Sequence, residues 1–317
     1  MAQVNVKPMT PQKVKTSKAA DYDMTKISQL SNAIIHFIFI IIVLLCVVPL
    51  VLVFMISITD NQTLLRYGYT LFPQQISWAA YDYILRGGRA ILNAYWVSVQ
   101  VTVIGTIAST AVMALYAYPL SRQSFKYRKL FTWLVLITML FTGGLVPWFI
   151  MYQQVLGIGN TMAVLVIPYL MNAWFVLILR TFYRSAIPED LLEAARIDGA
   201  GEFRAFFTIV LPLSTAGLAT VGLFMMITYW NDWWLPLIFI RTNDLDTIQN
   251  FLRQMLTNIQ FIARHPEMIG GRVDLAAMPT ETIRMAIAIV AVGPVVFAYP
   301  FFQRFFVKGM MIGAIKG

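Results

Sequence analysis

The chain has 317 residues, of which 59% are apolar and 12% are charged, and its mean hydropathy is +0.69. Soluble domains contain about 45–50% apolar and about 25% charged residues, so this composition argues strongly against a soluble enzyme and predicts an all-α integral membrane protein. The net charge of +9 fits basic loops on the cytoplasmic side of a membrane, and no nucleic-acid partner is expected. One cysteine, Cys46, and two distant histidines give no basis for a disulfide or a metal site.

Residues 1–32 are polar and basic, and we expect them to form a cytoplasmic tail. Beyond them, several stretches free of Asp, Glu, Lys and Arg are long enough to cross about 30 Å of hydrocarbon. They predict six transmembrane helices, near residues 33–57, 91–118, 130–152, 161–181, 208–230 and 283–303. The third and fourth helices share one uncharged stretch, which Gly157, Gly159 and Asn160 divide, because glycine and asparagine favour a turn. Residues 33–317 are therefore expected to form one transmembrane domain.

The basic residues are concentrated in the loops on one side of these predicted helices. An even number of spans puts both termini on the same side, and the positive-inside rule makes that side cytoplasmic. The outer segment 232–282 is long enough to escape this rule, but the short loops alone give the same orientation. We therefore expect a multi-pass protein of the cell membrane with both termini in the cytoplasm.

The predicted spans carry no formal charge in their middle. Transporters coupled to protons or sodium usually place an ionisable residue there, so a stand-alone secondary transporter is the weaker hypothesis. The chain also lacks the G-x-x-x-x-G-K-[ST] motif that cradles ATP phosphates, and no cluster of acids, bases or metal ligands indicates a catalytic residue. If ATP drives transport, hydrolysis takes place on another chain. Within the third helix, Gly143, Gly144 and Pro147 allow a break or close packing.

The most informative segment is the predicted cytoplasmic loop 185–213 between the fourth and fifth spans, where the pattern predicts a helix, a turn and a second helix. A proline and two acids suit the first turn of the first helix. Glu193 and Arg196 are three residues apart and can pair on one face of it. Asp198-Gly199 is a strong turn signal. From the residues alone, an ordinary amphipathic connector explains this segment as well as a docking helix does.

The pattern E-A-A-x-x-x-G followed by I-x-L-P resembles the EAA loop of ABC importer permeases, the binding-protein-dependent transport inner-membrane component family. The matching residues are Glu193, Ala194, Ala195, Asp198, Gly199, Ile209, Leu211 and Pro212. Gly201 stands where the family pattern has Ser, Thr or Asn, which slightly weakens the cap of the second helix. The resemblance covers about residues 91–306 and implies a permease domain over 33–317, with a cytoplasmic coupling helix between helices four and five. The C-terminal string FFVKGMMIGAIKG is similar to the subgroup that imports oligosaccharides.

In this family the EAA helix docks into a groove on an ATPase subunit, and closure of two ATPases moves the spans. The ATPase-coupling residues that the resemblance implies are Glu193, Ala194, Ala195, Asp198, Gly199 and Pro212. It implies no cofactor in this chain, an ATPase dimer that holds ATP and Mg²⁺, a second permease subunit and an extracytoplasmic solute-binding protein, in a bacterial inner membrane. The second permease is expected to be a different but related chain, and a homodimer remains open. Segments 58–90 and 232–282 are either docking surfaces for the binding protein or solvated loops.

If the solute is a carbohydrate, aromatic faces and polar side chains would recognise it. The candidate substrate-path residues are Trp230, Asn231, Asp232, Asn172, Trp174 and Tyr95. Tryptophans also anchor helices at the membrane interface, and polar residues in spans often join one helix to another. The expected function is the permease subunit of an ATP-driven importer for a carbohydrate, with an oligosaccharide favoured. A permease for amino acids, peptides or an anion is the alternative.

Overall fold

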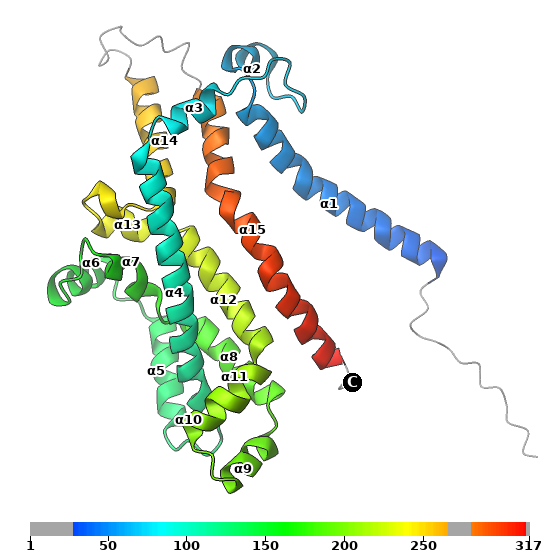
Figure 1. Cartoon of the computed structure of the whole chain (residues 1–317), viewed down its shortest axis with the longest axis vertical. Helices are drawn as coiled ribbons and strands as arrows, with labels where there is room; N and C mark the ends of the chain where they lie inside the picture. The colour runs from blue at the N-terminus through cyan, green and yellow to red at the C-terminus, as the bar shows by residue number, and fades with distance from the viewer. Residues whose placement is uncertain (1–27, 266–279, 315–317) are drawn as a thin grey trace, which may run out of the picture. The chain divides into compact units, whose positions relative to one another are not determined.

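The computed structural model describes residues 28–265 and 280–314, which are mostly helical (Figure 1). Apart from one bridge between Thr59 and Ile76, none of these residues pairs as a strand. The helices are α1 (Gln29–Ser57), α2 (Asn61–Tyr67), α3 (Ala79–Leu85), α4 (Arg89–Ser121), α5 (Arg128–Leu140), α6 (Leu145–Ile150), η1 (Met151–Val155), α7 (Met162–Val166), η2 (Ile167–Tyr169), α8 (Ala173–Ala186), α9 (Glu189–Ile197), α10 (Glu202–Ala205), η3 (Phe206–Val210), α11 (Leu211–Leu213), α12 (Thr215–Trp230), α13 (Trp234–Phe239), η4 (Asn243–Leu245), α14 (Ile248–Arg264) and α15 (Thr280–Ala314). The predicted all-α class is confirmed, while most of the predicted tail lies outside the described residues.

The chain divides into two units, Met1–Leu50 and Val51–Gly317. The described part of the first unit is the larger part of α1, and this helix carries Pro49 in its interior. Its 29 residues include a window with a mean hydropathy of 3.5, and about 20 apolar residues are enough to cross a bilayer. The first predicted span therefore coincides with one long apolar helix.

The second unit is organised around α4, which packs against both α8 and α12 (Figure 1). On its other side α12 packs against α15. The face that α4 buries is rich in small residues, among them Ala94, Ser98, Gly105 and Ser109. Small side chains let helix backbones approach closely, which is the usual way that helices associate in a membrane.

Three of the predicted spans are broken rather than continuous. The third turns by 115° between α5 and the α6–η1 segment, the fourth by 53° before α8, and the fifth by 80° before α12. By length and composition, two helices among the described residues, α1 and α4, can cross a membrane alone, and the number reaches five if each bent pair forms one span. The sixth predicted span, 283–303, falls within α15.

Each break has a local cause. Gly144 adopts a φ of 81° before α6, a left-handed conformation that glycine reaches without the penalty of a Cβ atom. The Asn172 side chain caps the start of α8, which favours a new helix there. Between α11 and α12, Ser214 has a φ of −101° and a ψ of 13°, which takes the backbone out of the α-helical conformation at the bend. Of these, only the break near Gly144 was anticipated from the sequence.

Buried apolar side chains form two clusters, a larger one along most of α4 and a smaller one at its beginning. The larger cluster joins α4 to α5, α7, α8, α9, η3, α12 and α13, and includes Met113, Val164, Leu179, Val221 and Tyr229. The smaller cluster joins the beginning of α4 and the end of α12 to α3, α14 and α15, and includes Ile84, Ile248, Leu252, Ile283 and Trp230. No secondary structure was predicted for segments 58–90 and 232–282, but residues 58–90 and 232–265 contribute packed helices as well as surface. Residues 266–279 of the second segment lie outside the described residues.

Candidate functional site

The predicted helix–turn–helix in the loop 185–213 is confirmed. Helix α9 begins directly after Pro188, and its last turn is closed by two hydrogen bonds, in which the Ala200 N–H donates to the Ala195 carbonyl (2.8 Å) and the Gly199 N–H to that of Arg196 (3.0 Å). This pattern requires a left-handed residue after the helix. Gly199 supplies it with a φ of 82°, and Gly201 then caps α10. The turn is therefore defined by backbone geometry that glycine accommodates best.

The predicted coupling residues lie at the surface: Ala195 is half-buried, and the others are exposed, namely Glu193, Ala194, Asp198, Gly199 and Pro212. The neighbouring Leu192, which was not among them, is buried and holds α9 against the larger apolar cluster. Two large apolar side chains beside the turn, Ile197 and Phe203, were not predicted as part of this surface, and they are 87% and 77% exposed. Their position on either side of the Asp198-Gly199 signal is what could have identified them. Together these residues give the loop an exposed apolar patch suited to contact with another surface.

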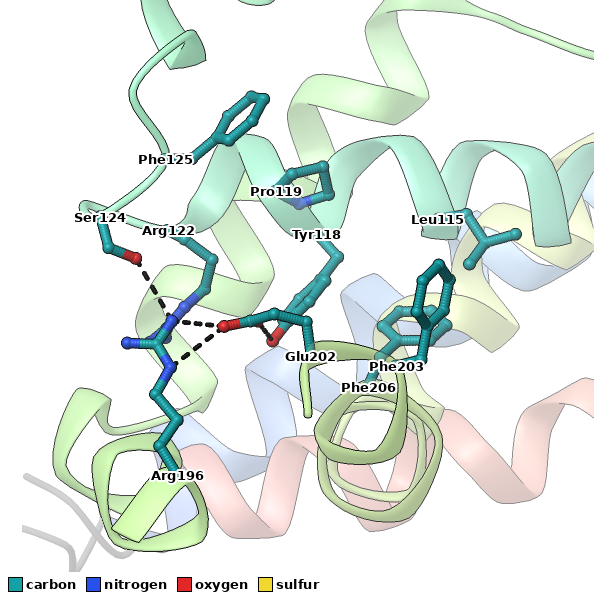
Figure 2. A pocket seen from close by; sticks show the side chains of 10 residues that line it. All are labelled: Leu115, Tyr118, Pro119, Arg122, Ser124, Phe125, Arg196, Glu202, Phe203 and Phe206. Atoms are coloured by element: carbon teal, nitrogen blue, oxygen red, sulfur yellow. Dashed lines mark hydrogen bonds and ion pairs between the residues drawn. The ribbon is translucent and has the colours of Figure 1, made fainter. Parts of the chain in front are cut away.

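Behind the turn, three helices meet at one carboxylate, that of Glu202 on α10 (Figure 2). The Tyr118 hydroxyl of α4 donates to Oε2 (2.7 Å), and Arg196 of α9 donates to Oε1 through Nε (3.0 Å) and Nη2 (2.5 Å). These two hydrogen bonds to Glu202 raise the pKa of Arg196. The predicted pair between Glu193 and Arg196 is wrong, because the guanidinium turns toward Glu202 instead.

The same carboxylate borders a pocket of about 560 Å³ between the end of α4 and the start of α10 (Figure 2). Its lining residues are Leu115, Tyr118, Pro119, Arg122, Ser124, Phe125, Arg196, Glu202, Phe203 and Phe206. Arg122 ends α4 with only 7% of its surface exposed, and its Nη2 lies 3.8 Å from Glu189 Oε1 at the start of α9. Both ends of α9 thus face charged partners near the end of α4.

Two of the candidate substrate-path residues, Tyr95 and Trp230, lie together and join helices. The Tyr95 hydroxyl donates to the Val290 carbonyl (2.6 Å), and the Trp230 indole N–H donates to that of Ala291 (2.9 Å). Their ring centroids are 6.3 Å apart. These contacts attach α4 and α12 to α15, as expected for polar groups that link helices.

The other four candidates lie at helix ends. Asn172 accepts the N–H of Trp174 (3.0 Å) at the start of α8, and Trp174 itself is 56% exposed. Asn231 ends α12 and is exposed, whereas Asp232 is only 8% exposed. Asp232 accepts the N–H of Trp234 (3.0 Å), which starts α13, and the hydroxyl of Tyr169 (3.3 Å). The described contacts of Asn172 and Asp232 are thus helix caps and a link between helices.

Asp232, two residues beyond the fifth predicted span, predicts a specific pH dependence of stability. Burial raises the pKa of its carboxyl to about 6, against an ordinary value near 3.8. Because the folded-state pKa is raised, this group contributes stability below the unfolded-state pKa and loses it as the pH rises through about 6. Between pH 7.5 and pH 4.5 wild type should gain on the order of 2 kcal/mol relative to Asp232→Asn. Thermal unfolding in detergent measures this difference, and a gap that stays constant with pH would contradict it.

Comparison with known proteins finds a family and relatives that match most of this chain. The family model described as "Binding-protein-dependent transport system inner membrane component" matches residues 110–312. The chain is 36% identical over 274 residues to the polygalacturonan/rhamnogalacturonan transport system permease protein YtcP of Bacillus subtilis, covering 86% of this chain and 94% of that protein. It is 29% identical over 281 residues to the arabinooligosaccharides transport system permease protein AraQ of Halalkalibacterium halodurans, covering 86% and 92%.

A solved structure shares the fold. It is a crystal structure of a bacterial ABC transporter involved in the import of the acidic polysaccharide alginate, one chain of which superposes with a TM-score of 0.72 and 25% identity, covering 87% of this chain and 95% of that one. The resemblance first indicated by the EAA loop is therefore confirmed over most of the length. The chain belongs to the binding-protein-dependent transport system inner membrane component family, the permeases of ABC importers.

Proposed function

We propose that this chain is the translocation subunit of an ATP-driven importer for carbohydrate, and that its cargo is an oligosaccharide. The observation that carries the proposal is the exposed α9 loop, in which the E-A-A-x-x-x-G residues lie on a short helix closed by a left-handed Gly199. The names of the relatives support a carbohydrate, since they refer to polygalacturonan, arabinooligosaccharides and alginate. The chain itself supplies the path, and a separate ATPase supplies the energy.

The proposed arrangement places six spans in the bacterial inner membrane, with both termini and α9 in the cytoplasm. The basic residues of the α4–α5 loop and of the α8–α10 region support this orientation through the positive-inside rule. An ATPase dimer binds ATP and Mg²⁺ and receives α9, and a second, related permease completes the path. A solute-binding protein delivers the cargo from outside, where segments 58–90 and 232–282 form the docking surface. The pairing of Arg253 with Trp233 (5.5 Å to the ring) supports a preformed polar rim on that surface.

Substitution of Ile197 tests whether the α9 loop receives the ATPase. Its exposed side chain would be buried by docking, so Ile197→Asp should reduce the ATPase recovered with the affinity-tagged permease by about tenfold. The measurement is co-purification after co-expression with the neighbouring transporter genes. Leu65→Asp is the matched control, because Leu65 is 67% exposed on α2, in a segment that the proposal places outside the cell. Equal ATPase recovery with Ile197→Asp and wild type would reject α9 as the docking element.

A further inference from the structure

We infer that Glu202 is a positioning residue that holds the coupling helix α9 to the cytoplasmic end of α4. Through this contact, movement of the ATPase is transmitted to α4, the second span, as well as to α12 in the fifth span. This inference rests on the proposed function, since it concerns how motion of α9 is passed on. The covalent chain links α9 to α12 through α10, η3 and α11. A route to α4 requires contacts between side chains, and Glu202 provides them.

The geometry makes this carboxylate a junction of three helices. One oxygen accepts two donors of Arg196 on α9, and the other accepts the hydroxyl of Tyr118 on α4, which is 84 residues away in the sequence. Arg196 Nη2 also approaches Ser124 Oγ (3.3 Å) in the loop that follows α4. Loss of Glu202 would leave Arg196 without its ion pair and Tyr118 without its acceptor at the same time (Figure 2).

A second contact holds the other end of α9 to the same place. Arg122, the residue that ends α4, is buried and faces Glu189 in the first turn of α9. The ends of α9 are therefore tied to one short segment, Tyr118–Ser124, through Glu189 on one side and Arg196 with Glu202 on the other. Two contacts fix the orientation of a short helix better than one does, so α9 and the end of α4 should move as one body.

The exposure of the side chains at this junction indicates that their hydrogen bonds position α9 more than they stabilise the fold. The side chains of Arg196 and Glu202 are 39% and 53% exposed, and ion pairs at such positions contribute little to folding because water screens them. By contrast, charge-assisted hydrogen bonds are short and directional, and Arg196 makes two of them to one oxygen of Glu202. Their removal should leave the fold intact while it loosens the link between α9 and α4.

The test is the amount of solute imported per ATP hydrolysed, measured with the complete transporter in proteoliposomes. Tyr118→Phe removes one oxygen atom and should lower this ratio about fivefold, and Glu202→Gln should lower it at least as much. The double variant should be no worse than Glu202→Gln alone, because both changes break the same junction. The amount of ATPase that co-purifies with each variant permease verifies that the transporter still assembles.

Tyr116→Phe is the matched control, because Tyr116 lies two residues away on α4 and donates its hydroxyl to the Phe131 carbonyl of α5 (3.2 Å). It loses one hydrogen bond of the same helix without touching Glu202, and its ratio should match wild type. A wild-type ratio in Tyr118→Phe, or equal losses in Tyr116→Phe and Tyr118→Phe, would overturn the inference while the proposed function stands. The proposed function fails separately if the wild-type complex shows no import that depends on ATP.

Discussion

Valine at position 199 is expected to reduce ATP-driven uptake at least tenfold. Gly199 has a φ of 82°, and an added Cβ would meet no atom within 4 Å, so the whole effect would come from backbone strain. The left-handed conformation costs an L-residue about 1–2 kcal/mol, and a β-branched side chain suffers more. The turn should relax to negative φ, which would rotate α9 away from its place beside α10. Uptake of labelled solute and ATPase activity in the reconstituted complex measure this uncoupling.

Two further variants separate strain from the mere addition of a side chain. Gly201→Thr adds a side chain of the same shape two residues away, at an ordinary φ of −71° and in open space, and it supplies a good helix cap. It should therefore retain uptake close to wild type. Gly199→Asn should fall between the two, because asparagine tolerates the left-handed region better than valine does. Uptake by Gly199→Val at the wild-type level would show that the turn does not depend on its left-handed residue.

Alanine at position 105 is expected to produce the largest loss of stability. A Cβ at Gly105 on α4 would lie 2.6–2.7 Å from three carbons of the Tyr229 ring on α12. Tyr229 is 1% exposed, and its hydroxyl donates to the Val166 carbonyl (2.9 Å), so the ring cannot move aside easily. Overpacking of this kind typically costs about 1–3 kcal/mol. The thermal midpoint in detergent should fall by roughly 2–5 °C.

Gly222 offers a matched comparison on the helix that faces α4. A Cβ there would lie 3.6 Å from Phe302 and 3.7 Å from Thr110, which are ordinary van der Waals distances. Gly222→Ala should therefore leave the thermal midpoint nearly unchanged, since alanine also favours helix more than glycine does. If both alanine variants shifted the midpoint equally, the close approach of α4 and α12 at Gly105 would not be the cause.

The sequence predicted features that depend on local chemistry. Apolar composition indicated a helical membrane protein, and Asp198-Gly199 indicated the turn that the structure contains. The bends before α8 and α12 were not predicted, because the hydropathy of a stretch records how apolar it is and not the direction in which its backbone runs. The sequence predicts Asn172 as a candidate substrate contact, and its role as the cap of α8 could not be predicted without the position at which that helix begins.

Contacts between residues that are far apart in the sequence could not be predicted from it either. The three-residue spacing of Glu193 and Arg196 predicted a local pair, but Arg196 finds a better partner in Glu202, whose place is also fixed by Tyr118 on another helix. Only the packing of α4 against the loop brings these groups together. For the same reason Trp230 could be named as an aromatic candidate, but its bond to α15 could not be foreseen.

Uptake by proteoliposomes with and without the ATPase chain decides whether this permease transports its solute only when an ATPase drives it. The permease pair, the ATPase and the binding protein are purified separately, and labelled oligosaccharide inside the vesicles is measured over time. We expect accumulation only when ATPase and ATP are both present, and none when residues 187–201, which include α9, are deleted from this chain. Accumulation of solute by vesicles that contain this chain but no ATPase would contradict the account.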